Sequence, residues 1–484
     1  LGGSFGTFAR AMWPASAAAV VIASASAWLR PQALWTAGPI LLAWLLSPLI
    51  AYLISRPLPK VEKPLSADDR RALRRLARKT WRYFETFVGE EDHWLPPDNF
   101  QEAPDGRVAH RTSPTNMGLL LVSTLAAEDL GYLPLASALD RLEKTFDALD
   151  RLERRWGHFY NWYHTQTLEP LPPLYVSTVD SGNLLGCLTT LRRGLLEKID
   201  APIVGPAIAL GLDDALNLAL ESGGLDGSRL KALIDPPPAD LPDWRSWLDL
   251  AEDEAERLAE TLAADPSRSG DAATAEVWAR KALEQVVEHR RHLDSLLGGE
   301  GFETTAVPTL AALSASRPAA AALVRRLQAL AARAEAMGRE MDFRPLYKKE
   351  RHLYAIGCDL SLGRLDGACY DLLASEACLT SYLTIARGEA HRKHWFQLGR
   401  PFVRAAGRIG LISWGGTMFE YLMPRLFLKG LPGTVLAEAC ETAVARQIEY
   451  AGRLGLPWGI SESAFSARYA DGDHRYQAFG TPGL

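Results

Sequence analysis

The sequence has little cysteine and no cysteine pattern typical of a metal site. Its five cysteines are odd in number, and none belongs to a C-x-x-C pair or to a Cys/His spacing that zinc requires. They stand in stretches with helical spacing of apolar residues, as buried thiols of a reducing compartment do. We therefore predict no metal site and expect reduced thiols at Cys187, Cys358, Cys369, Cys378 and Cys440.

Concentrated positive charge and phosphate-binding loops are also lacking. The 484 residues carry a formal net charge of -5, without the basic face that nucleic acids attract. No Walker loop and no dinucleotide-binding glycine loop occurs. These absences argue against a nucleic acid partner, and we expect no cofactor in this section of the chain.

An initiator methionine is missing, since the sequence begins at Leu1, and it stops at Leu484 directly after a motif. We therefore expect an excerpt from a longer polypeptide whose last helices are absent. The composition, with 48% hydrophobic and 23% charged residues, is typical of a globular protein with a large core.

Two early segments, residues 12–29 and 33–54, contain almost no charge. Each is long enough to cross a bilayer, which takes ~20 residues. Aromatic residues lie in or near their ends, as at membrane interfaces, and no small-residue cleavage site follows. A re-entrant or protein-packed helix is the alternative for the first segment. The aromatic residues are Trp28, Trp35, Trp44 and Tyr52.

The basic residues beside these segments predict an orientation. Arg10 precedes the first segment, Arg30 stands alone in the turn, and Arg56, Lys60 and Lys63 follow the second. The positive-inside rule then places both ends in the cytoplasm. Residues 1–63 are expected to form a transmembrane hairpin and linker, with contacts to lipid and a multi-pass topology, and the domain that follows is expected on the cytoplasmic side.

After the hairpin, apolar residues recur mostly at helical spacing, and the connections are long, aromatic and rich in glycine and proline. This pattern predicts a mainly α fold, an α/α toroid of the six-hairpin barrel type whose loops form a cleft at one end. Residues 64–199 and 342–484 would form the toroid, truncated before it closes. Residues 200–341 have simpler helical periodicity and few aromatics, which predicts an inserted helical subdomain.

Acids set among aromatics and glycines suggest a site for sugars. Glycoside chemistry needs two carboxyl groups across the scissile bond. Glu376 lies near the start of an apolar helix, where burial would raise its pKa and suit a general acid. Glu462 follows a Trp-Gly turn and is flanked by serines, which suits an ionised nucleophile. A partnered structural carboxylate and a helix cap remain the respective alternatives.

Further residues are expected to bind the sugar rather than react with it. Glu420 could bind hydroxyls or orient a partner, and Asp180 could be a helix cap or a sugar ligand. Histidines 164, 394 and 474 lack the partners of a nucleophile elbow, so we interpret them as structural or as supports for the residues that contact the sugar. The remaining expected ligands are Tyr163, Tyr370, Asp371, Trp414, Trp458 and Ser461.

Five motifs closely resemble those of cyclic β-1,2-glucan synthases. They are Ser-Thr-Val-Asp-Ser-Gly-Asn-Leu (177–184), Gly-Arg-Leu-Asp with Tyr-Asp-Leu-Leu-Ala-Ser-Glu-Ala (363–377), His-Trp-Phe-Gln-Leu-Gly-Arg-Pro (394–401), Ser-Trp-Gly-Gly-Thr-Met-Phe-Glu-Tyr-Leu-Met-Pro (413–424) and Pro-Trp-Gly-Ile-Ser-Glu-Ser-Ala (457–464). The resemblance covers most of the chain and is weakest from 200 to 330.

The resemblance implies a role for this section. Such synthases join a glycosyltransferase that uses UDP-glucose with Mg²⁺ or Mn²⁺, a middle domain that cyclises β-1,2-glucan by transglycosylation, and a phosphorylase-like domain. The chain is similar to the middle domain with its preceding membrane hairpin, which implies a place in the bacterial inner membrane with the catalytic domain on the cytoplasmic side. Glu376 would then be the acid/base and Glu462 the nucleophile, although these roles could be exchanged. A β-1,2-glucan hydrolase and a non-catalytic, membrane-anchoring glucan-binding module are the alternatives.

Overall fold

The computed structural model describes residues 4–55, 64–103, 106–223, 227–264, 271–298, 305–469, 474–477 and 480–484. The chain divides into two compact units. One comprises Leu1–Pro64 with Gly430–Ala439, and the other comprises Leu65–Lys429 with Cys440–Leu484. Each is described by itself below.

The first unit contains a helical hairpin. Helix α1 (Phe5–Leu29) packs against α2 (Leu34–Leu45) and α3 (Ser47–Ile54), which follow a 3-10 turn. Ser16 Oγ donates to the carbonyl of Leu45 at 3.1 Å. By length and composition α1 can cross a membrane, whereas α2 and α3, bent by 52°, pass that test only as a pair. The hairpin is confirmed as a structure, and the crossings stay a prediction. The basic residues 56, 60 and 63 lie outside the described residues.

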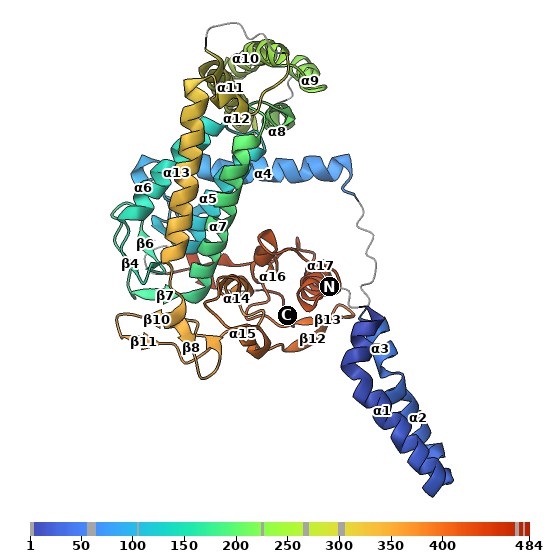
Figure 1. Ribbon diagram of the computed structural model, residues 1–484. Coiled ribbons are helices and arrows are strands. Elements are labelled where there is room, and N and C mark those ends of the chain that lie inside the picture. The colour runs from blue at the N-terminus through green and yellow to red at the C-terminus, as the bar shows by residue number, and fades with distance from the viewer. Residues whose placement is uncertain are drawn as a thin grey trace. The chain divides into compact units, whose positions relative to one another are not determined.

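The second unit is built mainly of helices, which confirms the predicted mainly α class (Figure 1). The α/α toroid itself stays a prediction. The helices are α4 (Ala67–Phe87), α5 (Pro114–Asp129), α6 (Leu135–Arg151), α7 (Thr178–Glu197), α8 (Pro206–Gly223), α9 (Ser228–Ile234), α10 (Leu241–Ala263), α11 (Asp271–Leu297), α12 (Leu310–Ser314), α13 (Pro318–Glu340), α14 (Ala377–Ala386), α15 (Lys393–Gln397) and α16 (Met418–Leu422), with most of α17 (Val435–Leu454).

Strands are short and lie in the connections between the helices. The largest described sheet has the order β11-β10-β7. The strands are β1 (Phe100–Gln101), β2 (Arg107–Val108), β3 (Arg111–Thr112), β4 (Arg154–Arg155), β5 (His158–Phe159), β6 (Tyr163–His164), β7 (Tyr175–Ser177), β8 (Tyr347–Lys348), β9 (Leu353–Tyr354), β10 (Gly357–Asp359), β11 (Arg364–Leu365), β12 (Phe402–Ala405), β13 (Arg408–Leu411), β14 (Ser463–Arg468) and β15 (His474–Gln477).

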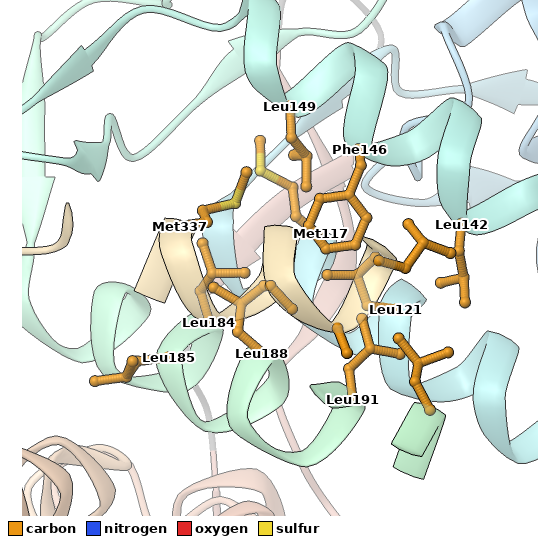
Figure 2. Packing of buried hydrophobic residues seen from close by; sticks show 14 of the residues in the cluster. Met117, Leu121, Leu142, Phe146, Leu149, Leu184, Leu185, Leu188, Leu191 and Met337 are labelled. Atoms are coloured by element: carbon orange, nitrogen blue, oxygen red, sulfur yellow. The ribbon is translucent and has the colours of Figure 1, made fainter. Parts of the chain in front are cut away.

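One large core lies between α5, α6, α7 and α13 (Figure 2). Phe146 of α6, Leu121 of α5 and Leu188 of α7 are almost fully buried in it. Burial of each such side chain stabilises the folded state by about 1.5–3 kcal/mol relative to leaving it in water. This core holds the helices that carry the candidate site in fixed positions.

A second core lies among α8, α9, α10 and α11, at the end of α7 and α13 opposite β7 and β10 (Figure 1). It takes its buried residues from 204–297, whereas α13 and α12 bury theirs in the first core. The predicted subdomain, 200–341, therefore extends too far at its C-terminal end, because α13 packs in the first core with α6 and α7. The division into domains otherwise stays a prediction.

Glycine lets α14 approach α7 closely. A Cβ at Gly182 would lie 1.7 Å from Thr380 Oγ1 and 2.9 Å from the Thr380 Cα. Gly186, one turn later, faces Leu379 in the same way, with a Cβ 3.0 Å from its nearest methyl group. Any larger residue at 182 would force α14 away from α7, and with it the residue that precedes α14, Glu376.

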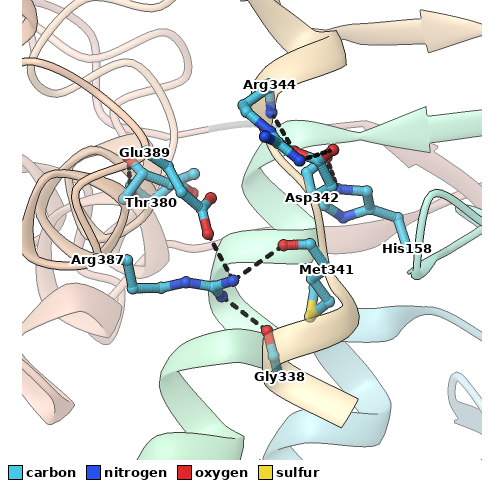
Figure 3. Close-up of polar contacts among 9 residues, drawn as sticks. His158, Gly338, Met341, Asp342, Arg344, Thr380, Arg387 and Glu389 are labelled. Atoms are coloured by element: carbon cyan, nitrogen blue, oxygen red, sulfur yellow. Dashed lines mark hydrogen bonds and ion pairs between the residues drawn. The ribbon is translucent and has the colours of Figure 1, made fainter. Parts of the chain in front are cut away.

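The far end of α14 is held by an arginine (Figure 3). Arg387 donates to the carbonyls of Gly338 and Met341 at 2.7 and 3.1 Å and pairs with Glu389 at 2.6 Å. Because these carbonyls end α13, the cation also complements the negative end of that helix. Close by, His158 Nε2 contacts the carbonyl of Asp342 at 2.8 Å. Both ends of α14 are thus fixed against the first core.

Candidate active site

The N-terminal ends of three helices meet at the candidate site. Thr115 lies in the first turn of α5, Asp180 in the first turn of α7, and Glu376 is the residue that precedes α14. The helices α5 and α7 begin here because serines cap them: Ser113 Oγ accepts from the amide of Asn116, and Ser177 Oγ from that of Asp180, both at 3.2 Å.

Hydrogen bonds link these three helix ends. Thr115 Oγ1 donates to Asp180 Oδ1 at 2.6 Å, and Asn183 Nδ2 donates to Thr115 Oγ1 at 3.1 Å and to Glu376 Oε2 at 3.5 Å. Asp180 and Asn183 share one helix face because they are three positions apart in sequence. Asn161, with its amide nitrogen turned toward Asp180 Oδ2, donates to it at 3.2 Å. Both oxygens of Asp180 therefore have protein partners.

Glu376 is deeply buried, with 3% of its surface exposed. Burial raises the pKa of Glu376 to about 8, the hydrogen bond from Ser375 lowers it, and the neighbouring charges of Glu462 and Asp180 raise it. The carboxyl group is therefore largely protonated at neutral pH, which is the state that a general acid needs. The sequence predicted this raised pKa from the apolar helix that follows.

Glu462 lies close enough for its charge to act on Glu376, and its own side chain is exposed. Its loop is held at Ile460, whose amide donates to Gln447 Oε1 at 2.7 Å and whose carbonyl accepts from Gln447 Nε2 at 2.8 Å. The amide of Met418 donates to the same carbonyl at 3.1 Å. These bonds fix the segment before Glu462 against α16 and α17.

An aromatic surface lies beside the carboxyl groups. The rings of Tyr370 and Trp414 stack with centroids 5.2 Å apart and planes at 22°. Trp414 leaves 54% of its surface exposed, while Tyr370 is buried and donates to the carbonyl of Ile356 at 3.3 Å. Burial raises the pKa of Tyr370, and the charges of Asp180 and Glu376 raise it further. Trp414 thus offers a supported face of the kind on which a pyranose ring stacks.

Two more predicted ligands occupy different surroundings. Trp458 leaves 53% of its surface exposed, four residues before Glu462. Asp371 packs closely against Gly399, where a Cβ would lie 2.1 Å from Asp371 Oδ1. Both stay predictions as sugar ligands.

The prediction for Tyr163 is wrong, because its side chain is fully buried in the first core. Its hydroxyl donates to the carbonyl of Glu153 and accepts from the amide of Tyr160. A residue with no exposed surface and an internally bonded hydroxyl has a structural role. Its position among aromatic neighbours gave no sign of this burial.

The interpretation of Glu420 as a sugar ligand is also corrected. Its carboxylate accepts from Ser413 Oγ at 2.9 Å, from the amide of Gly415 at 3.0 Å and from that of Thr417 at 3.1 Å, and 3% of its surface is exposed. Thr417 and Glu420 form a capping box at the start of α16. Glu420 therefore holds the loop that carries Trp414. Ser461 Oγ likewise serves the fold, since it accepts from the amide of Phe419 at 3.1 Å.

The histidine interpretation agrees with the contacts of His394, which is fully buried. Its Nδ1 contacts the carbonyl of His352 at 2.9 Å and its Nε2 contacts Ser381 Oγ at 2.8 Å. Within the described part of the chain, no group of three or more His, Cys, Asp or Glu side chains is arranged to hold a metal ion. All five cysteines are free, and four are buried.

A cavity of about 420 Å³ lies elsewhere, between α4, α8 and α9. Its lining includes Arg75 and Glu221, which pair with each other at 2.7 Å. None of the predicted catalytic or sugar-binding residues lines it.

Sequence reasoning missed Thr115, Asn183 and Ser375 as members of the site. Asn183 could have been found, because it stands three residues after Asp180 on a predicted helix. Ser375 immediately precedes Glu376, and its hydroxyl donates to Glu376 Oε2 at 2.9 Å. Thr115 comes from a different helix, and no motif in the sequence pointed to it.

Comparison with known proteins gives distant structural similarities. The fold resembles a candidate glucoamylase from Bacteroides fragilis NCTC 9343 at 14% identity and a TM-score of 0.47, covering 87% of this chain and 75% of that one. It resembles an endo-β-1,2-glucanase from Chitinophaga pinensis, solved with sophorotriose and glucose, at 13% identity and a TM-score of 0.46, covering 86% and 75%. No family model matches the chain.

The sequence similarity is much stronger. The chain is 38% identical over 500 aligned residues to the cyclic β-(1,2)-glucan synthase NdvB of Rhizobium meliloti strain 1021. The alignment covers 100% of this chain and 17% of that protein, so the chain spans a small part of its relative's length. The resemblance predicted from the motifs is thus confirmed: the chain is similar, over its whole length, to a section of a cyclic β-1,2-glucan synthase.

Proposed function

We propose that this chain rearranges linear β-1,2-glucan into rings by retaining transglycosylation, as the middle section of a cyclic β-1,2-glucan synthase. The observation that carries the proposal is the pairing of a buried glutamic acid with an exposed one nearby. Burial keeps Glu376 protonated, and the charge of Glu462 acts on it. Two carboxyl groups in different environments can serve as proton donor and as nucleophile.

The reaction takes two steps. A Glu462 oxygen attacks C1 of a glucose unit, the bond from C1 to the leaving oxygen breaks, and that oxygen receives the proton of Glu376. The non-reducing end of the same glucan then gives its hydroxyl proton to Glu376, its oxygen bonds to C1, and Glu462 is released. Each step inverts C1, so the linkage is retained overall.

Ring formation requires a sugar acceptor in place of water. The exposed face of Trp414, supported by Tyr370, would hold a glucose ring beside the carboxyl groups. Trp458 and Asp371 are further candidates for contacts to the glucan. Binding of the chain's own end would then exclude water from the glycosyl-enzyme.

Product analysis on linear β-1,2-glucan tests the proposal. We expect rings whose reducing ends have disappeared, which chromatography with mass spectrometry detects as a loss of one water relative to the linear chains. Shorter linear chains would identify a hydrolase instead. Unchanged glucan, in a preparation of the whole synthase that elongates normally, would favour a glucan-binding module.

The hairpin is proposed to anchor this section in the inner membrane, with the second unit on the cytoplasmic side. Supporting this, α1 can span a bilayer by length and composition, and Arg30 stands alone in its turn. The proposed partners are lipid, the β-1,2-glucan, and glycosyltransferase and phosphorylase-like domains of the same polypeptide.

Protease added to sealed inner-membrane vesicles of inverted orientation should cut the second unit. Full protection there, with cleavage in right-side-out vesicles, would contradict this topology.

A further inference from the structure

The two oxygens of the Glu376 carboxyl group have different surroundings. Oε2 accepts from Ser375 Oγ at 2.9 Å and faces Asn183 Nδ2 at 3.5 Å. Oε1 is buried and has no hydrogen-bond partner among the residues that the structure describes. A protonated carboxyl group has one oxygen that donates and one that accepts. An oxygen that faces two donors is suited to accept, so the proton belongs on the other.

The orientation of Asn183 is not arbitrary, because Thr115 determines it. The Thr115 hydroxyl has a single hydrogen, which it donates to Asp180 over 2.6 Å. Thr115 Oγ1 can then only accept from Asn183, 3.1 Å away, so that atom must be the amide nitrogen. The second hydrogen of the same nitrogen is left for Glu376 Oε2. Every bond from Asp180 to Glu376 therefore has a defined direction.

Ser375 is held in place by its backbone. Its φ of +50° lies in the left-handed region, which residues other than glycine adopt at an energetic cost. This conformation brings its hydroxyl to Oε2 of the residue that follows. Donors from two separate elements, the Ser375 turn and α7, thus converge on one oxygen.

We propose that Asp180, Thr115, Asn183 and Ser375 are positioning residues that keep the acid proton of Glu376 on Oε1, the oxygen that gives it to the glucan. This inference rests on the proposed role of Glu376 as the acid. Glu376 has 3% of its surface exposed. The side chains that cover Oε1 must therefore move when the glucan binds. The sugar then supplies the acceptor that Oε1 lacks.

A Thr115→Val substitution in the whole synthase tests the inference, since valine keeps the shape and removes the hydroxyl. The Asn183 amide could then turn its oxygen toward Glu376 and draw the proton onto Oε2. We expect kcat to fall roughly tenfold with KM nearly unchanged, the scale of one lost hydrogen bond. We also expect the alkaline limit of kcat/KM to move to higher pH, because a neutral carboxyl group gains a partner.

Three further variants make the result specific. Thr115→Ser keeps the hydroxyl and should restore kcat and the pH profile. Ser375→Ala should move the alkaline limit in the same direction as Thr115→Val, since its hydrogen bond lowers the pKa of Glu376. Ser381→Ala removes a buried hydroxyl from α14 that contacts His394 instead, and should leave the pH profile unchanged.

The outcomes separate this inference from the proposed function. The positioning role alone would be overturned if Thr115→Val and Ser375→Ala both kept the wild-type kcat and pH profile while Glu376→Gln was inactive. An equal shift of the alkaline limit in Ser381→Ala would also overturn the positioning role, because the loss of any buried hydroxyl group would then produce the same shift. A fully active Glu376→Gln enzyme would remove the proposed acid and the inference together.

Discussion

Glu462→Gln is expected to reduce the transfer of β-1,2-glucan by roughly 10⁴-fold or more, the scale on which a reacting side chain matters. Glutamine keeps the shape of the side chain and removes the attacking charge, so no glycosyl-enzyme forms. Initial rates of ring formation from linear glucan measure the effect. Because Glu462 is exposed, the variant should fold normally.

Azide then identifies which carboxyl group attacks C1. Shortening the side chain in a Glu462→Gly enzyme opens the space beside C1, so azide should attack from that side and give a glycosyl azide of inverted configuration. In the Glu376→Gln enzyme azide should attack the glycosyl-enzyme and give the retained anomer. The reverse pattern would exchange the two roles.

Glu449→Gln serves as the control for these variants. It removes a carboxylate from α17, where Glu449 pairs with Arg446 and Arg453. Its activity should remain close to that of the wild type. Full activity in the Glu462 and Glu376 variants alike would leave the glucan-binding module as the better explanation.

The two candidate glutamates could be predicted from sequence because each stands in a motif whose local pattern indicates its environment. An apolar helix follows Glu376, so its burial was visible, and its raised pKa follows from burial first. Asn183 and Ser375 lie within the same motifs. Their roles were not visible, because the direction of a hydrogen bond depends on Thr115 of another helix.

The errors have equally specific causes. Thr417 and Glu420 are separated by the three-residue spacing of a capping box, so the sequence already held the signal that Glu420 binds its own backbone. Tyr163 could not be told from an exposed aromatic by its neighbours. The end of the insertion was misplaced because α13 has the same simple periodicity as α10 and α11. Only packing reveals that α13 belongs to the first core.

Glu376→Gln is expected to abolish proton donation while making the protein more stable. The loss of activity should be about 10²- to 10⁴-fold, the usual contribution of a general acid. It should be smallest for substrates with a good leaving group, such as an aryl β-glucoside of a β-1,2-linked disaccharide, because these need little protonation. A loss equally large for such substrates would argue against the acid role.

The gain in stability should depend on pH in a defined direction. The folded protein holds the Glu376 proton up to a pKa of about 8, whereas the unfolded chain releases it near the ordinary value of 4.5. Between these values the folded state binds the extra proton, so the free energy of unfolding of the wild type falls as pH rises. Glutamine does not titrate, so the free energy of unfolding of the variant lacks this decrease with pH.

The melting temperatures of the two proteins should therefore be close near pH 5, diverge as pH rises to about 8, and stay apart above it. A pKa raised from 4.5 to about 8 corresponds to at most about 5 kcal/mol, at 1.36 kcal/mol for each pH unit, so several degrees are expected. In a protein that already carries Glu462→Gln, the difference in melting temperature that Glu376→Gln produces should be smaller, because the charge of Glu462 no longer raises the pKa of Glu376. A constant difference between pH 5 and 9 would mean that Glu376 is not buried as a neutral acid, and the source of the catalytic proton would have to be sought elsewhere.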